Sequence, residues 1–359
     1  MTDTFSVARL SKLQHILKEK NIPALLVTNL NNIRYLSGFT GTSAMIIVSS
    51  KKSYFLTDFR YTTQAKKQVK ASEIIEYRNA NSVILDICKK NKIDELAIEA
   101  EHMQIDLFKR LKKDLKPIKL THSKGLIESL RCFKDNEEVK LIKEAIKISA
   151  KALKEILPLI KEGVEERDIA LELEFQMRRF GAEKGAFDFI VASGYRSSMP
   201  HGVASRKKIK KGNIVTVDFG CIYKGYNSDI TRTFCVGKAG EKEKRIYKLV
   251  YEAQALAFEK IEEGKTTGAI DKAARDFFEK QNVGEFFGHG LGHGVGLDVH
   301  EKPVLSRGMK ERIGEGMVFT IEPGLYFPKK FGVRIEDMIL IKKGKPQILT
   351  KDIPKIFEI

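Results

Sequence analysis

Apolar residues in the first 120 positions recur at two spacings, one typical of helices and one typical of strands. Residues 9–20 carry apolar side chains three or four positions apart, as one face of an amphipathic helix requires: Leu10, Leu13, Ile16 and Leu17. Short apolar runs at residues 24–27, 44–48 and 54–56 predict buried strands, and the last of them ends at a turn-like Thr57-Asp58. This alternation predicts an α/β domain.

The pattern changes in the second part of the chain. Asp135-Asn136, followed by Glu138, resembles a helix start and predicts a long amphipathic helix through Leu157. Further helices are expected at about residues 166–180 and as a pair between residues 242 and 280. Strand-like runs occupy the remainder, and they are separated by turns at Gly194, Gly212, Lys224-Gly225 and residues 328–332. This order predicts an α+β domain with a long antiparallel sheet.

The length of the chain predicts two domains. A chain of 359 residues exceeds the usual size of one hydrophobic core, and 42% hydrophobic residues suffice to fold two. Mixed charge and the interruption at Gly125 mark a junction in residues 123–136. We therefore expect domains at residues 1–121 and 122–359.

The stretch GHGLGHGVGLDVH, residues 288–300, holds three of the chain's seven histidines: His289, His293 and His300. His289 and His293 have the i, i+4 spacing of a helical metal site, but each interspersed glycine would cost about 1 kcal/mol in a helix interior. A strand or loop is expected instead, in which glycine lets the backbone pass close to substrate and metal. His293 and His300 are an odd number of residues apart, so a turn or bulge must lie between Gly294 and His300 if they share a face.

Two predicted hairpins each carry a pair of acidic residues. The pairs are Asp218 and Asp229, symmetric about Tyr223-Lys224, and Glu322 and Glu336, symmetric about Lys329. Residues opposed across a hairpin have Cβ atoms roughly 5 Å apart, and like charges placed so are destabilising unless a cation lies between them. A single acidic residue at a strand end is more often a turn or cap residue. Two such hairpins with a Gly/His stretch between them favour a metal site.

Four carboxylates and one imidazole match a pair of divalent cations about 3.5–4 Å apart, bridged by carboxylates and by a water whose pKa the cations lower. The imidazole would come from one of the three histidines in residues 288–300. Mn²⁺ is the first choice because carboxylate-rich sites suit it, with Co²⁺, Zn²⁺ and Fe²⁺ as alternatives.

Several motifs carry a resemblance to a known family. They are SMPHG (198–202), VDFGCIYKGYNSDITRTF (217–234), GHGLGHGVGLDVHE (288–301), TIEPG (320–324) and GVRIED (332–337). Their order and spacing resemble those of the pita-bread metallopeptidases, family M24, which include creatinase, aminopeptidase P, prolidase and methionine aminopeptidase. Residues 1–121, with NIRYLSGFTG and TDFRY, also resemble the creatinase-type amino-terminal domain. Methionine aminopeptidases generally lack that domain, so the Xaa-Pro branch is the closer match.

The resemblance implies a role for individual residues. The ligand positions of its dinuclear centre fall on Asp218, Asp229, His293, Glu322 and Glu336, and none is altered. His201 and His300 would be catalytic, binding substrate and stabilising the tetrahedral intermediate. Glu322 would also pass a proton to the leaving nitrogen. The family pattern places three further residues, His289, Arg334 and Tyr326, in contact with the peptide or with the site carboxylates.

The implied function is that of an Xaa-Pro aminopeptidase, which hydrolyses the bond between an N-terminal residue and a following proline. An Xaa-Pro dipeptidase (prolidase) is the alternative, because the loops that restrict a prolidase to dipeptides leave no sequence motif. Creatinase works without metals and would not be expected to keep all five ligands. A non-catalytic pita-bread binding module is a remote alternative, since such modules typically lose ligands.

Composition limits the partners and the location. The net charge of +17 is spread along the chain, with 21 Lys and Arg against 12 Asp and Glu in residues 1–120, so no specific nucleic-acid partner is expected. No segment resembles a signal peptide or a membrane span, and the four cysteines form no CxxC pair, which predicts a cytoplasmic protein without membrane association. The expected partners are an Xaa-Pro peptide and, by resemblance, a second copy in a homodimer.

Overall fold

A computed structural model describes residues 2–359, with side chains from residue 5 onward. The chain forms two compact units, Met1–Arg131 and Cys132–Ile359. The boundary expected at residue 122 falls within β6 (Lys119–Ser123), and the first unit continues through helix α6 (Leu126–Arg131). Arg131 explains the difference, because its buried guanidinium donates a 2.8 Å hydrogen bond to Asn32 Oδ1 and so ties α6 to the first unit.

The first unit is built on a six-stranded mixed sheet in the order β4-β3-β2-β1-β5-β6. Its other strands are β1 (Ala24–Val27), β2 (Ala44–Ser49), β3 (Ser53–Thr57), β4 (Glu73–Glu76) and β5 (Glu95–Glu99). The three predicted strands are confirmed as β1, β2 and β3. All four β1 side chains are buried, as expected of a central strand that is covered on both faces.

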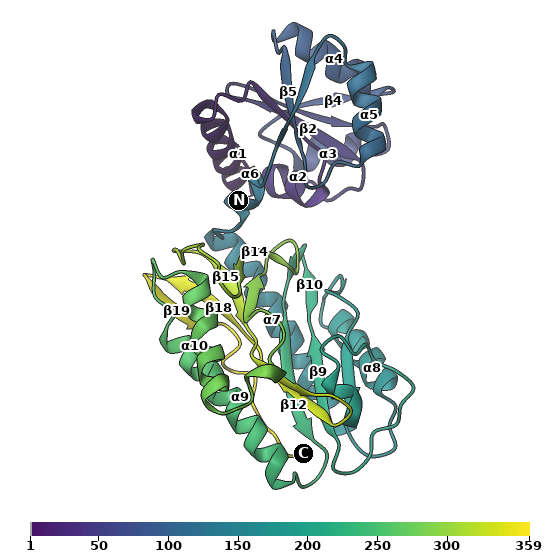
Figure 1. The fold of residues 1–359 in the computed structure, drawn as a ribbon. Coiled ribbons are helices and arrows are strands. Elements are labelled where there is room, and N and C mark those ends of the chain that lie inside the picture. Colours follow the sequence, from purple (N-terminus) through teal and green to yellow (C-terminus); the bar gives the residue numbers. More distant parts are fainter. Residues whose placement is uncertain (1) are drawn as a thin grey trace. The chain divides into compact units, whose positions relative to one another are not determined.

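Helices cover both faces of this sheet (Figure 1). They are α1 (Thr2–Glu19), α2 (Leu30–Ser37), α3 (Thr62–Gln68), α4 (Ala80–Lys90), α5 (Ile105–Asp114) and α6. Ile84 on α4 and Leu111 on α5 pack in one core with Leu26 and Ile47 of the sheet. On α1, Leu10, Leu13 and Leu17 of the predicted apolar face are buried. The first unit is therefore the α/β domain that the sequence predicts.

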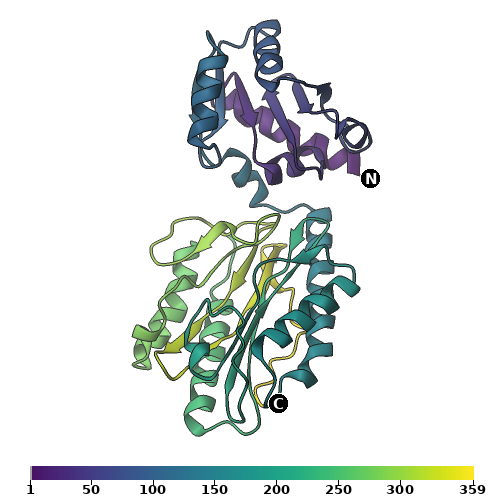
Figure 2. The same cartoon turned by 90° about the vertical axis from the view of Figure 1, so that its right-hand side faces the viewer.

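The second unit contains two helix pairs. They are α7 (Asn136–Ile156) with α8 (Glu166–Arg179), and α9 (Glu241–Glu259) with α10 (Thr267–Lys280). The helix start predicted at Asp135 is confirmed, since Asp135 and Glu138 form a reciprocal capping box. Helix α7 contacts β10 and β11, whereas α9 contacts β15, β16 and β17, so strands lie between the two pairs (Figure 2).

The strands of the second unit pair antiparallel with their neighbours. They are β7 (Lys184–Gly185), β8 (Ile190–Ser193), β9 (Ile214–Phe219), β10 (Cys221–Tyr223), β11 (Tyr226–Asn227), β12 (Ile230–Cys235), β13 (Gly292–Gly294), β14 (Glu301–Leu305), β15 (Val318–Ile321), β16 (Gly324–Phe327), β17 (Phe331–Arg334), β18 (Asp337–Lys342) and β19 (Lys345–Ile348). Short 3₁₀ helices, η1 (Leu157–Leu159), η2 (Gly194–Ser198) and η3 (Gly284–Phe286), lie in the connections.

The long antiparallel sheet expected from the sequence is divided into four shorter sheets. Their orders are β11-β10-β7, β12-β9-β8, β14-β13-β15-β18-β19 and β16-β17. Three acidic residues, Asp229, Glu322 and Glu336, stand at the breaks between strands. Their backbone N–H groups leave the hairpin ladders and donate to Met338 Sδ, Leu291 O and Thr231 O respectively. The interruptions therefore bring together segments that are distant in the sequence.

Two composition-based expectations can be compared with the structure. All four cysteines are buried and unbridged, as their spacing indicates. Among the helices of residues 2–359, none combines the length and the apolar composition that crossing a bilayer would need.

The stability of the second unit is expected to depend on Arg232, the largest of its fully buried side chains. Arg232 Nη2 lies 2.9 Å from Asp337 Oδ1, and the guanidinium also donates to three backbone carbonyls. Replacing Arg232 by methionine should lower the free energy of unfolding by about 3 kcal/mol, because three buried carbonyls lose their donor and Asp337 keeps only Lys355 as a charged partner. Urea denaturation would measure the loss.

The matched control for that substitution is Arg178→Met. Arg178 forms an ion pair with Glu174 in which both side chains are more than 40% exposed. Exposed pairs contribute at most about 1 kcal/mol. Equal losses for the two variants would show that burial of the Arg232 pair does not matter.

Candidate metal centre

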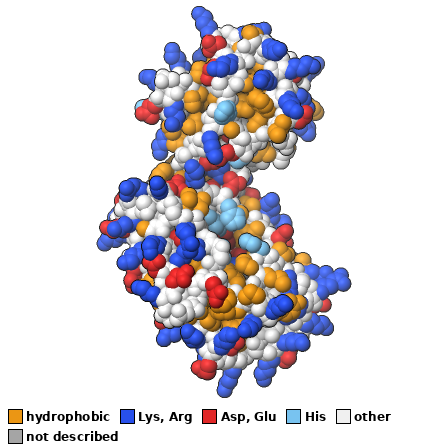
Figure 3. Space-filling model, in the orientation of Figure 1, with side chains coloured by type: hydrophobic (Ala, Val, Ile, Leu, Met, Phe, Trp, Pro, Cys, Tyr) orange, Lys and Arg blue, Asp and Glu red, His pale blue; other side chains and the backbone are white. Residues whose placement is uncertain are grey.

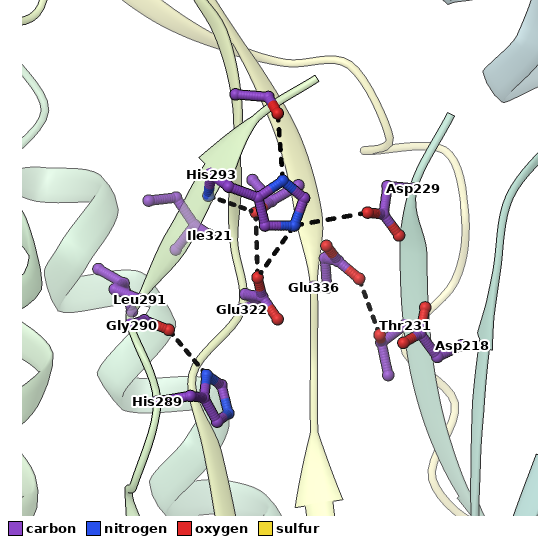
Figure 4. A network of polar contacts seen from close by, with 12 residues as sticks. Asp218, Asp229, Thr231, His289, Gly290, Leu291, His293, Ile321, Glu322 and Glu336 are labelled. Carbon is purple, nitrogen blue, oxygen red and sulfur yellow. Dashed lines mark hydrogen bonds and ion pairs between the residues drawn. The ribbon is translucent and has the colours of Figure 1, made fainter. Parts of the chain in front are cut away.

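The first hairpin brings Asp218 and Asp229 to one face, but not in the predicted register. Its two-residue turn is Lys224-Gly225, where both residues have positive φ, as a type I′ turn requires. Asp218 therefore pairs with Thr231 rather than with Asp229. The turn predicted at Lys224-Gly225 is confirmed, but the predicted pairing is wrong because it was centred on Tyr223-Lys224, one residue too early. Side chains two positions apart on a strand lie on the same face, so Asp229 lies on the face of Thr231 and of its partner Asp218. The carboxylates of Asp218 and Asp229 therefore point into the same region (Figure 4).

The second hairpin has the predicted register. Ile321 pairs with Asp337 and Phe327 pairs with Phe331, and both pairs are symmetric about Lys329. The carboxylates of the intervening Glu322 and Glu336 reach the same region as those of the first hairpin (Figure 4).

The Gly/His segment is a short strand, β13, with irregular backbone on both sides, as the glycine content predicts. A Cβ atom at Gly292 would lie 2.0 Å from Thr320 O, and one at Gly294 would lie 2.0 Å from Lys302 O. At these two positions glycine admits a neighbouring strand, so the expectation that it clears room for substrate or metal is corrected here.

The irregularity predicted between His293 and His300 is present. Pairing of β13 with β14 shifts register between His293 and Gly294, and bends follow up to His300. The two imidazole rings consequently lie near each other, with centroids 4.1 Å apart.

His293 faces the carboxylates (Figure 4). Its Nε2 atom lies 3.3 Å from Glu322 Oε1 and 3.6 Å from Asp229 Oδ2. One ligand atom from each of Asp229, His293 and Glu336 lies within 4.8 Å of the others, a spacing that a single metal ion could bridge. Glu336 is oriented by Thr231, whose hydroxyl donates to Glu336 Oε2 at 2.8 Å.

Asp218 has one carboxylate oxygen occupied and one unused. Its Oδ2 accepts a 2.7 Å hydrogen bond from Arg334 Nη2. Its Oδ1 is buried and finds no hydrogen-bond partner among the described residues. A buried polar atom without a partner is costly, so an unfilled acceptor beside other carboxylates indicates a place for a cation.

The electrostatics of the cluster also favour a cation. Burial raises the pKa of Asp229 and of Glu336 well above the usual value, and the neighbouring carboxylates raise both further. Burial, together with the charge of Asp218, raises the pKa of Glu322 to about 8. Burial lowers the pKa of His293 to about 4, which leaves its imidazole neutral and able to bind a metal near pH 7. The residues present therefore fit a divalent metal.

A cavity of about 510 Å³ opens beside the cluster, and it is lined by all five predicted ligands together with His201, His289, His300 and Arg334. Figure 3 shows histidine side chains gathered on one face of the second unit. Burial lowers the pKa of His289 to about 4 and also lowers that of the more exposed His300, so both are neutral near pH 7. The structure thus brings these predicted residues to one cavity.

Tyr326 lies behind this lining. Its hydroxyl is 2.9 Å from His289 Nε2 and accepts a 2.8 Å hydrogen bond from Arg334 Nη1. Burial raises the Tyr326 pKa to about 12, so the hydroxyl stays protonated. Its direct contact with substrate stays a prediction, while its position orients His289 and Arg334.

Sequence reasoning missed Thr231 and the apolar part of the lining. Thr231 is bonded to Glu336 and also accepts from Arg334 Nε at 3.1 Å. Strand periodicity could have found it, because it shares a face with Asp229 two positions earlier. The apolar lining residues Phe187, Ile190, Val203 and Val304 carry no such signal, since apolar residues of this kind occur throughout the core.

Known proteins resemble this chain along nearly its whole length. The model of metallopeptidase family M24 matches residues 140–343, and that of the creatinase/prolidase N-terminal domain matches residues 9–133. The Xaa-Pro dipeptidase of Pyrococcus furiosus is 38% identical over 345 residues, covering 96% of this chain and 97% of the relative.

Solved structures of similar proteins match this chain in fold as well as in sequence. The Xaa-Pro dipeptidase from Bacillus anthracis matches with a TM-score of 0.96 and 39% identity, over 99% of this chain and 100% of that one. The X-Pro aminopeptidase from Thermotoga maritima matches with a TM-score of 0.88 and 39% identity, over 94% and 98%. The expected fold class, a creatinase-like α/β domain followed by an α+β domain with antiparallel sheets, is confirmed. The chain therefore belongs to metallopeptidase family M24, with a creatinase-type amino-terminal domain.

Proposed function

We propose that this protein is a dinuclear metallopeptidase that hydrolyses the bond between an N-terminal residue and a following proline. One observation carries the proposal: a single cavity is lined by four carboxylates and His293 together with His201, His289, His300 and Arg334. The names of the similar proteins, Xaa-Pro dipeptidase and X-Pro aminopeptidase, support the substrate class.

Two divalent cations would be held by Asp218, Asp229, His293, Glu322 and Glu336. Mn²⁺ is the first choice for such a carboxylate-rich set, with Co²⁺, Zn²⁺ and Fe²⁺ as alternatives. When bound, the cations would supply Lewis acidity and an activated water. The unused Oδ1 of Asp218 and the neutral His293 support this assignment.

Glu322 is the proposed proton carrier. Its carboxylate lines the cavity beside the other proposed ligands, where it can take up a proton from the attacking water and release it again. Thr320 Oγ1 donates to Glu322 Oε1 at 3.3 Å and steadies the carboxylate within reach of the cavity. Glu322 would deliver the proton to the nitrogen that leaves.

The non-ligand histidines are proposed to hold the peptide. His201 and His300 are exposed to the cavity and could donate to the oxygen of the scissile carbonyl as charge develops there. Proline suits this arrangement because its tertiary amide brings no N–H that the site must satisfy. Phe187, Ile190 and Val304 offer apolar contact to a pyrrolidine ring.

Peptide length separates the two activities within the proposal. The similar structure from Bacillus anthracis is named an Xaa-Pro dipeptidase, and this name supports dipeptides as the first candidate substrates. The similar structure from Thermotoga maritima is named an X-Pro aminopeptidase, and this name supports longer peptides as the second candidate. The homodimer remains part of the proposal, and sedimentation analysis would test it.

The test is to remove metal with a chelator, restore Mn²⁺, and compare an Xaa-Pro dipeptide with an Xaa-Pro-Yaa tripeptide. We expect metal-dependent release of the first residue, from the dipeptide alone for a dipeptidase and from the tripeptide as well for an aminopeptidase. An Xaa-Ala dipeptide is the matched substrate control. Binding of two metal ions without cleavage of either proline peptide would show that the Xaa-Pro assignment is wrong.

A further inference from the structure

His201 lines the cavity from a backbone segment, residues 193–205. This segment begins at the end of β8 and leads toward β9. The His201 imidazole forms no hydrogen bond with any other side chain of residues 5–359, and it is exposed. Its position in the cavity must therefore come from the backbone that carries it. Whatever holds residues 193–205 also places His201.

Both ends of this segment converge on one buried carboxylate, that of Glu166 at the first position of α8. Glu166 Oε1 accepts hydrogen bonds from Ser193, at 2.7 Å from its backbone N and 2.8 Å from its Oγ. Glu166 Oε2 accepts from Ser205, at 3.2 Å from its backbone N and 2.6 Å from its Oγ. One side chain thus joins the two ends of the segment.

Arg196, which lies within the segment, also bonds to Glu166. Its Nη1 pairs with Glu166 Oε2, and its Nη2 donates at 2.7 Å to Val203 O. The Glu166 side chain is fully buried and that of Arg196 is 15% exposed, so the bond is charge-assisted and shielded from water. Such bonds define geometry closely.

The middle of the segment is bonded to the metal-centre side of the cavity. Arg334 Nη1 donates at 3.1 Å to Pro200 O, next to His201, and Gly332 N donates at 2.9 Å to Ser197 Oγ. Glu166 itself does not line the cavity and has no bond to any of the five proposed ligands. Its influence on the site therefore passes through the segment.

We propose that Glu166 is a positioning residue, which by joining Ser193, Arg196 and Ser205 holds residues 193–205 so that His201 faces the peptide. The inference rests on the proposed role of His201 in binding peptide. It adds a residue outside the cavity to the machinery of the reaction. A displacement of about 1 Å in a catalytic group can cost about 10²-fold in rate, so a loosened segment should have a large effect.

The first measurement does not depend on activity. Hydrogen exchange of the metal-free protein is followed by mass spectrometry in wild type, Glu166→Gln and the matched control Glu174→Gln, which lies on the same helix in a half-exposed ion pair. We expect peptides from residues 193–205 to exchange at least about tenfold faster in Glu166→Gln alone, because the amides of Ser193 and Ser205 lose their charged acceptor. Unchanged exchange in that segment would overturn the proposal.

The second measurement asks whether Glu166 acts through His201. In wild-type background, Glu166→Gln should lower kcat/KM for the proline peptide about 10²-fold. In a His201→Ala background the same change should lower kcat/KM less than about threefold, because the group being positioned is gone. The number of bound Mn²⁺ ions should be unchanged. An undiminished effect without His201, or a parallel loss of metal, would refute the positioning role.

A milder variant keeps the proposal testable if Glu166→Gln does not fold. Ser205→Ala removes one hydrogen bond to Glu166 Oε2 and should shift both measurements in the same direction by a smaller factor. If wild type cleaves no proline peptide, the proposed function fails. The exchange measurement would still show whether Glu166 anchors the segment, so the two failures are distinguishable.

Discussion

Substitution of His293 by alanine is expected to lower kcat/KM for a proline dipeptide by at least about 10³-fold, a loss of about 4 kcal/mol in transition-state stabilisation. His293 is the one nitrogen donor among the proposed ligands, and its Nε2 lies within 3.6 Å of both Asp229 and Glu322 carboxylates. Without it, the cations would lose a ligand and the acidic residues would lose a neighbour that fixes their spacing. Activity at saturating Mn²⁺ and metal content after dialysis would be measured together.

His15→Ala is the matched control for this variant. His15 lies on α1 in an exposed pair with Glu19, so its loss should change neither activity nor metal content. If His293→Ala kept more than a tenth of wild-type activity and its full metal content, the ligand role of His293 would be refuted.

The metal-free protein is expected to lose about 2 kcal/mol or more of unfolding free energy between pH 6.5 and pH 8. The pKa of Glu322 is raised from 4.5 to about 8, and those of Asp229 and Glu336 are also raised. Groups whose pKa is raised by folding stabilise the protein at low pH. This stabilisation disappears as the pH rises through the pKa that the group has in the folded protein. Urea denaturation in the presence of a chelator would measure it.

The buried histidines change the unfolding free energy with pH in the direction opposite to the carboxyl groups, but they do so below pH 6.5. Burial lowers the pKa of His289 and His293 from 6.5 to about 4, so their contribution is present above pH 6.5 and lost as the pH falls toward 4. Only the carboxylates among these groups change the stability between pH 6.5 and pH 8. Within this window the metal-free protein should therefore be most stable at pH 6.5.

Saturating Mn²⁺ should reverse this dependence, because a cation binds the deprotonated ligands more tightly as the pH rises. A metal concentration of 100 times Kd adds about 2.7 kcal/mol. Glu336→Gln should make the metal-free protein more stable at pH 8, because it removes one titratable carboxyl group from the buried cluster. It should also remove most of the gain from Mn²⁺, because it removes a proposed ligand. Stability of the metal-free wild type that rises from pH 6.5 to pH 8 would contradict the electrostatic account of the site.

Local sequence patterns predicted much of this molecule. Strands β1, β2 and β3 and the start of α7 follow from apolar spacing and from the Asp135–Glu138 capping pair. The symmetry of Glu322 and Glu336 about Lys329 predicted the second hairpin. The symmetry argument failed by one residue at the first hairpin, because it was centred on Tyr223-Lys224, whereas the positive φ angles that form the turn are at Lys224 and Gly225. Turn conformation depends on a few backbone angles that apolar periodicity does not report.

The sequence by itself indicated which residues form the candidate site, because each acid and histidine lies in a short motif that matches the family pattern. Only the tertiary structure decided how they meet. The breaks at Asp229, Glu322 and Glu336 are produced by hydrogen bonds to Met338, Leu291 and Thr231, which are far away in the sequence. The junction of Glu166 with Ser193, Arg196 and Ser205 likewise joins separate elements, α8 and the segment after β8. Contacts of this kind depend on three-dimensional packing, and no local pattern of residues encodes them.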